Sequence, residues 1–447
     1  MTALTDLAEK TLSEAKKAGA EAADVLAVTG TSVSIDVRAG KLEEATREEG
    51  TDISLRVLIG QRQAVVSVSD TSADTLREMA ERAVAMAREA PEDASLGLAE
   101  ASQLSGEADG TRLDLADPAD EPDPSRLQSM ATEAEAAALA VSGVTQTQGA
   151  GAGYTERAVV LTATNGFQAQ TRRTGTSLSC VAISGEGTGM ERDYDGDSRV
   201  YLSDLRAASE IGRTAGERCV ERTGARKPPT GSFPVLYDER VASSLIGHLM
   251  QAINGSAIAR GASWLRDAEG ELVLPEALSL TEDPHRPRML SSRLTDAEGL
   301  PTAERHWVEN GVLTGFVTDL GTARKLGRDS TANAARGLSS GPSPSTTNLA
   351  LTQGDQSRGD LIAQMGTGLL ITSMIGQTIN PNTGDYSRGA AGFWVEKGEI
   401  AYPVNECTVA GNLRDMLRTI IPANDARTWT GRVIPSLLVD GLTLAGA

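Results

Sequence analysis

The stretch TGDYSRGAAGFWVE, residues 383–396, places acidic, basic, aromatic and small residues within one short run. It lies in a segment, 256–447, that is rich in Gly, Thr and Ser and contains short β-like runs such as 369–375 and 433–439. Apolar runs of this length between turn residues are typical of strands. Helices should be few here, and the clearest candidate covers 354–365. We therefore predict a large β-rich C-terminal domain over residues 230–447.

The start of this domain has the pattern of a strand followed by a helix. The strand covers 233–237, and the helix opens with Asp238 as its N-cap and ends before Gly255. At roughly 100° per residue, one side of this helix collects an apolar stripe with a histidine in it: Val241, Leu245, His248 and Ala252. A histidine in such a stripe is usually a hydrogen-bonded core residue, and a functional role is the alternative.

Residues 1–225 are predicted to form an N-terminal α+β region. Helical spacing of apolar residues over 4–15 is followed by alternating runs at 33–37, 53–59 and 66–68, and then by a second helix over 76–86. Gly40, Gly50 and Gly60 fall between the runs. The pattern predicts a helix, an antiparallel meander with glycine turns, and a helix, together forming a unit over 1–90.

A second unit of the same order follows a linker. Residues 90–124 are rich in Pro, Asp and Glu, as linkers often are. A helix is expected at 125–141, strands at 156–163, 167–175 and 176–184, and a helix near 198–220. No residue-level repeat relates this unit, 125–220, to the first, so a true duplication stays open. The predicted fold class is α+β: helix–β-meander–helix units followed by the large β-rich C-terminal domain.

Charge and composition exclude several classes of function. The 42 Lys+Arg and 61 Asp+Glu residues give a net charge of −19, which argues against a nucleic-acid surface. No apolar run approaches the ~18 residues of a membrane span, and Asp6 and Glu9 argue against a signal peptide. We expect a cytoplasmic protein with no membrane partner. Cys180, Cys219 and Cys407 are too widely spaced for a CxxC zinc site.

Several short motifs are present but lack their usual context. Residues 337–341 match GxSxG around Ser339, but a nucleophile elbow needs a preceding strand and a following helix. Pro342 and Pro344 follow instead, so a flexible loop is expected, within a long coil-like region, 326–350, that is functional or mobile. The GxGxG triplets at 149–153 and 185–189 suggest hairpins or hinges. His306 and Glu309, three positions apart, are expected to be a surface pair.

A family resemblance emerges from the stretch quoted first and from three other pieces of sequence. Residues 383–396, 398–404, 410–413 and 247–249 closely resemble the signatures of the TldD/PmbA family, also labelled modulators of DNA gyrase. The resemblance covers nearly the whole chain and is strongest over 231–447. The best match is with the PmbA (TldE) branch.

The resemblance implies a subunit of a two-chain cytoplasmic zinc peptidase. TldD members of the family hold zinc through HExxxH on the corresponding helix and a cysteine near the C-terminus. When the chains are aligned through Arg260–Ser263, the two histidines fall on Ile246 and Gln251 and the glutamate on Gly247, and no cysteine follows Cys407. The expectation is a chain with no catalytic residue, no metal ligand and no cofactor, paired with a TldD-like chain that carries the zinc.

The leading hypothesis is a non-catalytic subunit whose partner cuts unfolded or extended peptides in a shared cavity. The candidate cavity residues are His248, Gln251, Asp385, Tyr386, Ser387 and Arg388. Residues 385–388 form a polar, glycine-flanked loop in this interpretation, which suits contact with a substrate or partner. The alternative is a structural turn with Asp385 and Arg388 paired. Alternative functions are a stand-alone peptidase or hydrolase that pairs with itself as a homodimer, or a peptide-binding regulatory module.

Overall fold

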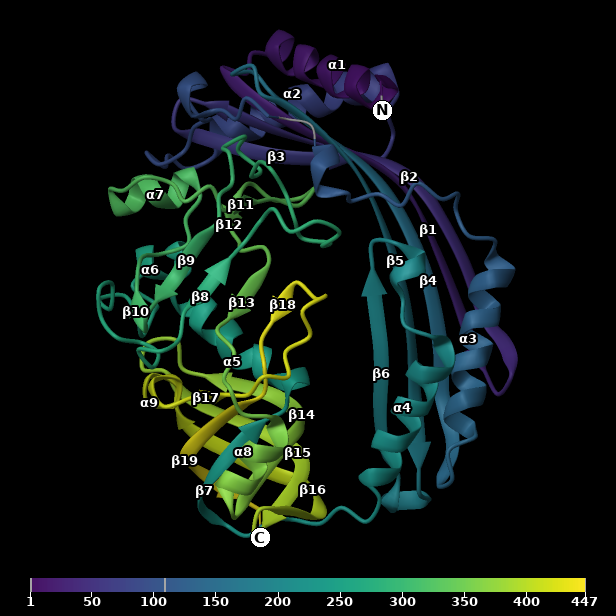
Figure 1. Cartoon of the computed structure of the whole chain (residues 1–447). Helices are drawn as coiled ribbons and strands as arrows, with labels where there is room; N and C mark the ends of the chain where they lie inside the picture. Colours follow the sequence, from purple (N-terminus) through teal and green to yellow (C-terminus); the bar gives the residue numbers. More distant parts are fainter. Residues whose placement is uncertain (1, 108–109, 447) are drawn as a thin grey trace.

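The computed structural model describes residues 2–107 and 110–446 and consists of a long curved N-terminal sheet and a C-terminal region on its inner side (Figure 1). The fold class is α+β, as the sequence predicts, with strands dominating the C-terminal region. No helix in the part of the chain described is both long and apolar enough to cross a membrane.

Two units of identical element order build the N-terminal sheet. The first is α1 (Thr2–Ala18), β1 (Ala22–Arg38), β2 (Lys41–Ile59), β3 (Arg62–Val68) and α2 (Ala73–Glu89). The second is α3 (Pro124–Leu139), β4 (Val144–Ala163), β5 (Gln168–Ser184), β6 (Glu191–Arg199) and α4 (Ala208–Glu221). The first strands of both units pair antiparallel, which gives one six-stranded sheet in the order β3-β2-β1-β4-β5-β6.

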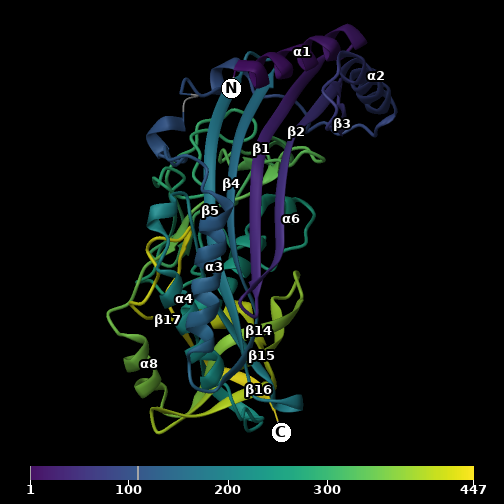
Figure 2. The ribbon, with the colours of Figure 1, turned by 90° about the vertical axis from the view of Figure 1, so that its right-hand side faces the viewer.

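The four helices cover one face of this sheet, as Figure 2 shows from the side of α3 and α4. Alternate residues of a strand point to opposite faces. Val25 of β1 accordingly packs with α1 and α2, and Val33 with α3 and α4. Asp24 and Leu26 point the other way, towards the C-terminal region. The inner face of the sheet is therefore available to that region.

The structure corrects the predicted strand boundaries. Gly50 is not a turn residue but lies inside β2 opposite Gly30 of β1. The triplet at 149–153 lies within β4 rather than in a hairpin or hinge, whereas the triplet at 185–189 does occupy the turn between β5 and β6. The two predicted runs at 167–175 and 176–184 are one strand, and β6 occupies the start of the helix predicted near 198. Long strands conceal these boundaries because glycine is tolerated where backbones approach closely.

The segment between the two units packs against the C-terminal region. It contains two short 3₁₀ turns, Ala101–Gln103 and Gly110–Leu113. Arg324 of α7 (Leu320–Leu326) donates hydrogen bonds to the carbonyls of Ser95 and Leu98, at 3.0 and 3.1 Å. The predicted linker is thus fixed in place by backbone contacts to a second part of the molecule.

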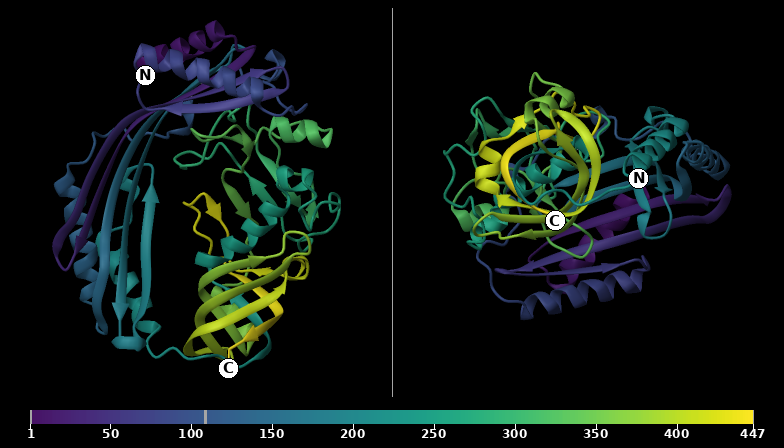
Figure 3. Two further views of the ribbon diagram at one scale, coloured as in Figure 1. Left: turned by 180° about the vertical axis from the view of Figure 1, so that it is seen from behind. Right: turned by 90° about the horizontal axis from the view of Figure 1, so that it is seen from below.

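A closed barrel forms the far end of the C-terminal region (Figure 3). Its strands are β7 (Gly231–Tyr237), β14 (Gly368–Ile379), β15 (Asp385–Glu396), β16 (Glu399–Asn412) and β19 (Leu437–Ala445). They pair in the order β16-β15-β14-β7-β19, and a further pairing of β16 with β19 closes the ring. Short β17 (Ile421–Pro422) extends β19, and α8 (Arg358–Met365) and α9 (Leu413–Arg418) flank the barrel.

A smaller sheet lies between the barrel and the N-terminal sheet. Its order is β10 (Val312–Leu313), β9 (Arg305–Glu309), β8 (Leu280–Glu282), β13 (Leu349–Leu351) and β18 (Arg432–Val433). The run predicted at 433–439 is therefore split between β18 and β19. Residues 326–350 contain a small hairpin, β11 (Ala334–Ala335) with β12 (Ser343–Pro344), and Ser339 lies in its loop, as predicted. His306 is exposed on β9 and contacts Thr281 at 3.0 Å.

Candidate functional site

Helix α5 (Glu239–Ala252) follows β7 and is held by a buried cap. The Asp238 side chain accepts from the Arg240 backbone N–H at 3.2 Å and forms ion pairs with the guanidinium groups of Arg240 and Arg358, at 3.2 and 2.5 Å. Asp238 is only 2% exposed, so these partners keep its charge satisfied inside the protein. The cap and the helix that it starts are where the sequence predicts them.

A pocket of about 580 Å³ lies beside the C-terminal half of α5. We call it the α5 pocket, and it is lined by His248, Gln251, Ala252, Asn254, Ala257, Arg260, Ala262, Trp264, Ile379 and Pro381. Two of the six predicted cavity residues, His248 and Gln251, therefore line one pocket. Amide, imidazole and guanidinium groups converge there beside the apolar surfaces of Trp264 and Ile379, which is typical of a ligand site.

His248 is buried, as its place in the apolar stripe predicts, but it lacks the expected hydrogen bonds. The residue is 4% exposed, and neither ring nitrogen has a partner of good geometry among the described residues. Burial lowers the pKa of His248 to about 4, the Arg388 charge lowers it further, and Gln251 acts in the opposite direction. The imidazole is therefore neutral at pH 7, with its lone pair and its N–H unused.

Residues 385–388 start strand β15 and do not form a loop. Tyr386 pairs with Ile379 of β14 and with Gly411 of β16, so the segment is hydrogen-bonded on both sides. Alternation along the strand buries Tyr386 and turns Asp385 outwards. The ring of Tyr386 meets that of His248 edge to face, with centroids 5.9 Å apart. The strand thus brings the predicted residues of β15 to α5.

Asp385 and Arg388 each have their own partners, which corrects the alternative in which they pair. Asp385 accepts hydrogen bonds from Thr383 Oγ1 at 2.6 Å and Asn412 Nδ2 at 3.1 Å, and these bonds lower the pKa of its carboxyl. Arg388 Nε donates to the Gly376 carbonyl at 2.8 Å. Arg388 lies on the same side of the strand as Tyr386, and its charge acts on His248, whereas exposed Asp385 and half-buried Ser387 belong to the other side.

Gly384 links the start of β15 to the wall of the α5 pocket. Its φ is +81°, in the left-handed region that favours glycine. A Cβ added there would lie 3.3 Å from Trp264 Cγ. The turn before β15 can therefore rest against the indole only because this residue has no side chain.

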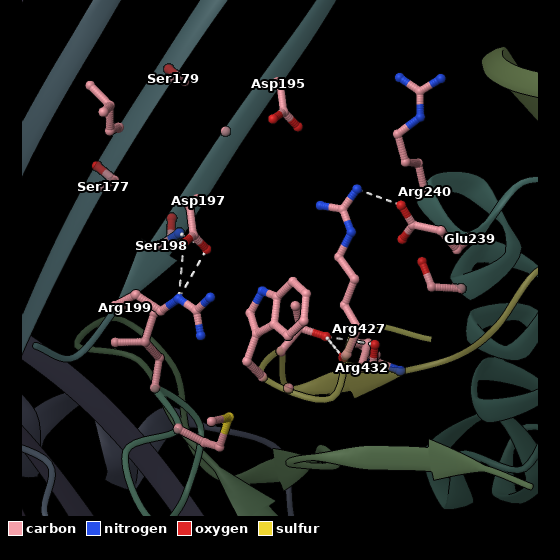
Figure 4. A pocket seen from close by; sticks show the side chains of 18 of the residues that line it. Ser177, Ser179, Asp195, Asp197, Ser198, Arg199, Glu239, Arg240, Arg427 and Arg432 are labelled. Carbon is pink, nitrogen blue, oxygen red and sulfur yellow. Dashed lines mark hydrogen bonds and ion pairs between the residues drawn. The ribbon is translucent and has the colours of Figure 1, made fainter. Parts of the chain in front are cut away.

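A second cavity, which the sequence did not indicate, opens between the N-terminal sheet and the C-terminal region (Figure 4). This interdomain cleft measures about 590 Å³ and is lined by β5, β6, the start of α5, and residues 288–291 and 427–432. Arg199 and Asp197 pair at 3.0 Å on one side, and Arg427 pairs with Glu239 on the other. Trp429 is 40% exposed. The residues that line the cleft come from segments far apart in the sequence, so no local motif could reveal it.

Comparison with known proteins identifies the family. Residues 23–87, 117–223 and 230–446 match the family models of PmbA/TldA metallopeptidase domain 1, central domain and C-terminal domain. The chain is 35% identical to Metalloprotease PmbA of Escherichia coli O157:H7 over 437 residues, which is 97% of this chain and 94% of that protein. The chain belongs to the PmbA/TldD family. The resemblance seen in residues 383–396 is thereby confirmed.

Further relatives place the chain in the PmbA branch of the PmbA/TldD family. A Metalloprotease PmbA homolog of Haemophilus influenzae is 33% identical, covering 97% of this chain and 94% of that protein. A crystal structure of a proposed DNA gyrase modulator from Bacteroides thetaiotaomicron superposes with a TM-score of 0.90 at 28% identity, with 99% of both chains covered. TldE from Thermococcus kodakarensis shares the fold at a TM-score of 0.84 and 19% identity, covering 98% of this chain and 100% of that one.

The residues at the family's metal-binding positions do not fit a zinc ion. Ile246 is fully buried in the apolar core, Gly247 has no side chain, and Gln251 alone lines the α5 pocket. Cys407 is buried, its thiol donates to the Ala390 carbonyl at 3.2 Å, and burial raises its pKa to about 11. Among the residues described, no three His, Cys, Asp or Glu side chains gather as a metal site requires.

Proposed function

We propose that this chain is the non-catalytic, metal-free subunit of a TldD–TldE-type zinc peptidase that acts on unfolded or extended peptides. One observation carries the proposal: α5 presents Ile246, Gly247 and Gln251 where the TldD motif has its two histidines and glutamate. Neither Ile nor Gly offers a lone pair, and an amide is a poor zinc ligand beside imidazole or thiolate. A TldD-like partner would supply the zinc, which lowers the pKa of a bound water.

The α5 pocket supports a role in holding the peptide. Gln251 and Arg260 provide polar groups that suit a peptide backbone, and Trp264 and Ile379 provide apolar surface. The neutral imidazole of His248 can accept or donate one hydrogen bond without the desolvation cost of a charge. These groups can bind and orient a peptide chain. They do not include a reactive thiol, because the buried thiol of Cys407, beside β15, is not ionised at pH 7.

The test compares the chain alone with the chain mixed with a TldD-like partner. Cleavage of an unfolded peptide should require both chains and should stop when a strong chelator is added. Metal analysis of this chain purified alone should give well below one zinc per molecule. Chelator-resistant cleavage by the isolated chain, or stoichiometric zinc in it, would overturn the proposal.

Substitutions in the mixture test the pocket itself. Arg388→Ala and Gln251→Ala should each lower peptidase activity about tenfold or more, because each removes a polar contact worth roughly 1.5 kcal/mol or more when charged or buried. Arg266→Ala is a matched control, since Arg266 lies on the surface beside Asp267 with 59% of its side chain exposed. Full activity of Gln251→Ala in folded protein would show that the α5 pocket does not face the substrate, and full activity of Arg388→Ala would show the same for Arg388.

A further inference from the structure

A third cavity lies where the inner face of the N-terminal sheet meets the C-terminal region. It measures about 260 Å³ and is distinct from the α5 pocket and from the interdomain cleft. We call it the arginine pocket because three guanidinium groups line it, those of Arg173, Arg293 and Arg336. Its walls come from β1, β4 and β5, from the turn at 110–115, and from residues 293–297 and 335–336.

Two of these arginines are held by carbonyl groups rather than by acids. Arg173 donates to the carbonyls of Leu290 and Ser292 at 2.9 and 2.7 Å. Arg293 donates to the carbonyls of Ala334 and Ser345 at 2.7 and 2.9 Å. Among the described residues, neither has a carboxylate within ion-pair distance. Two positive charges are thus fixed in position and left without direct neutralisation.

The neighbouring acids are already engaged. Asp24 pairs with Arg336, and it also pairs with buried Arg56 at 2.5 Å, so one carboxylate serves two cations. Asp296 accepts three backbone N–H bonds, from Glu298, Leu300 and Ala334, at 2.9–3.1 Å. Of the described residues that line the pocket, three carry guanidinium groups and one, Asp296, carries a carboxylate.

The arrangement of these cations carries an electrostatic penalty. The Nε atoms of Arg293 and Arg336 are buried and have no hydrogen-bond partner within the described part of the chain. Burial lowers the pKa of Arg173 to about 10, and the charge of Arg293 contributes to this. A bound anion would offset the repulsion between these two cations, and charge-assisted hydrogen bonds to guanidinium are among the stronger ones.

The rest of the wall is apolar. Leu26 and Leu161 reach the pocket from the sheet, and Leu113 and Leu294 approach from the connecting turn and the C-terminal region. A hydrated inorganic ion alone would leave this surface against water. A ligand with an aliphatic part would cover this surface. Each Å² of apolar surface removed from water favours binding by about 25 cal/mol.

We propose that the arginine pocket binds a small organic carboxylate with a short aliphatic chain. Its carboxylate would lie between Arg173 and Arg293, and its chain would lie against the leucines. The volume is slightly below the roughly 300–1,000 Å³ of common ligand pockets, which restricts the ligand to a few carbons. Because its walls come from both halves of the molecule, the ligand stabilises their contact, and it raises the melting temperature further as its concentration increases above Kd.

Binding to the intact protein is measured by calorimetry and thermal unfolding, with three probes. 4-Methylpentanoate should bind saturably and raise Tm. Its neutral isostere 4-methylpentanamide should bind at least tenfold more weakly, because it lacks the charge that guanidinium favours. Inorganic phosphate should also be at least tenfold weaker, because it lacks the chain. Equal binding of the amide, tighter binding of phosphate, or no saturable binding of the carboxylate at millimolar concentration would each overturn the proposal.

Two variants locate the site independently of the probe series. Arg293→Gln removes one charge, and Ala169→Phe fills the pocket from β5 without changing charge. Each should weaken 4-methylpentanoate at least tenfold. Arg112→Gln is the matched control, because Arg112 lies on the nearby 3₁₀ turn, is 48% exposed and pairs with Glu107. Unchanged affinity in folded Ala169→Phe would place the binding elsewhere. If Arg293→Gln does not fold, Ala169→Phe and the three probes still show whether the carboxylate binds in the arginine pocket.

Discussion

Glu298 is a half-buried residue whose carboxyl changes its charge state near neutral pH. Burial of the carboxyl and the neighbouring charges of Asp296 and Asp319 together raise its pKa to about 8, against the Leu320 N–H that donates to it at 2.7 Å. The group is thus mostly protonated at pH 7. It lies in the segment that joins the arginine pocket to α7, where two other acids leave little room for a third negative charge.

Glu298→Gln should therefore stabilise the protein in a pH-dependent way. The pKa of this carboxyl is raised from 4.5 to about 8 in the folded protein, so the carboxyl ionises first in the unfolded chain. The free energy of unfolding therefore falls as pH rises through this window. The stability of the variant relative to the natural protein should grow by about 3 kcal/mol between pH 5 and pH 8. Urea unfolding at both pH values measures this, with Glu304→Gln, an exposed position, as control. A difference in stability between the two proteins that is the same at pH 5 and pH 8 would contradict the prediction.

His248 gives the opposite pH dependence. Its folded pKa of about 4 lies below the ordinary 6.5, so the unfolded chain takes up the proton first as pH falls. Between pH 7 and pH 4 the free energy of unfolding of the natural protein should fall by at most about 3 kcal/mol through this residue, and the His248→Gln variant should not show that fall. Unfolding of both proteins across this range checks it. Loss of partner-dependent peptidase activity in a fully folded His248→Gln would show that the ring takes part in function.

Helices and their caps were readable from the sequence, and strand lengths were not. Asp238 and the apolar stripe of α5 fix that helix locally. Glycine predicts the turns at Gly40 and Gly60 correctly, but the turn predicted at Gly50 is wrong, because that residue lies inside β2. Gly392, in the middle of β15, shows why: a Cβ there would lie 1.9 Å from the Leu370 carbonyl of β14, so its absence permits a close strand contact. Only the paired strand reveals that requirement.

The candidate site was predictable only in part, because local sequence patterns mark some of its residues and not others. The family signatures singled out His248, Gln251 and Arg388, and the fold brings all three to one end of α5. The interdomain cleft and the arginine pocket could not be foreseen. Arg173 and Arg293 carry no local pattern, and they meet only because β5 lies against the C-terminal region.

The buried cap of α5 allows a test of how much its ion pairs contribute to the stability of the protein. Asp238→Ala removes both the cap and the partner of two arginines, and should cost at least about 3 kcal/mol, because charges are left unpaired in a buried setting. Asp238→Asn keeps a capping oxygen and should cost less. Denaturant midpoints of both are compared with Ser357→Ala, which removes the exposed cap of α8. A loss in Asp238→Ala no larger than that of Ser357→Ala would show that the buried pairs add no stability.

At the scale of the whole molecule, ion pairs join the two halves at separated places. Arg240 of α5 meets Asp193 of β6 at 2.9 Å, and Lys325 of α7 meets Asp93 of the linker at 2.7 Å. The Arg336–Asp24 pair lies beside the arginine pocket. These contacts hold the N-terminal half and the C-terminal region together, and Arg240 among them lines the interdomain cleft.

The last prediction concerns assembly with a TldD-like chain. Ile375 of β14 is 77% exposed beside Gly376, the residue that holds Arg388, so it lies at the edge of the group that the proposed partner would face. Burying an apolar side chain of this size at an interface would remove its surface from water, which favours association. Ile375→Asp should weaken heterodimer formation about tenfold or more, measured by calorimetric titration and by light scattering during size exclusion. Leu42→Asp, at the distant β1–β2 turn and 47% exposed, should leave pairing unchanged. Equal pairing of both variants would place the interface elsewhere.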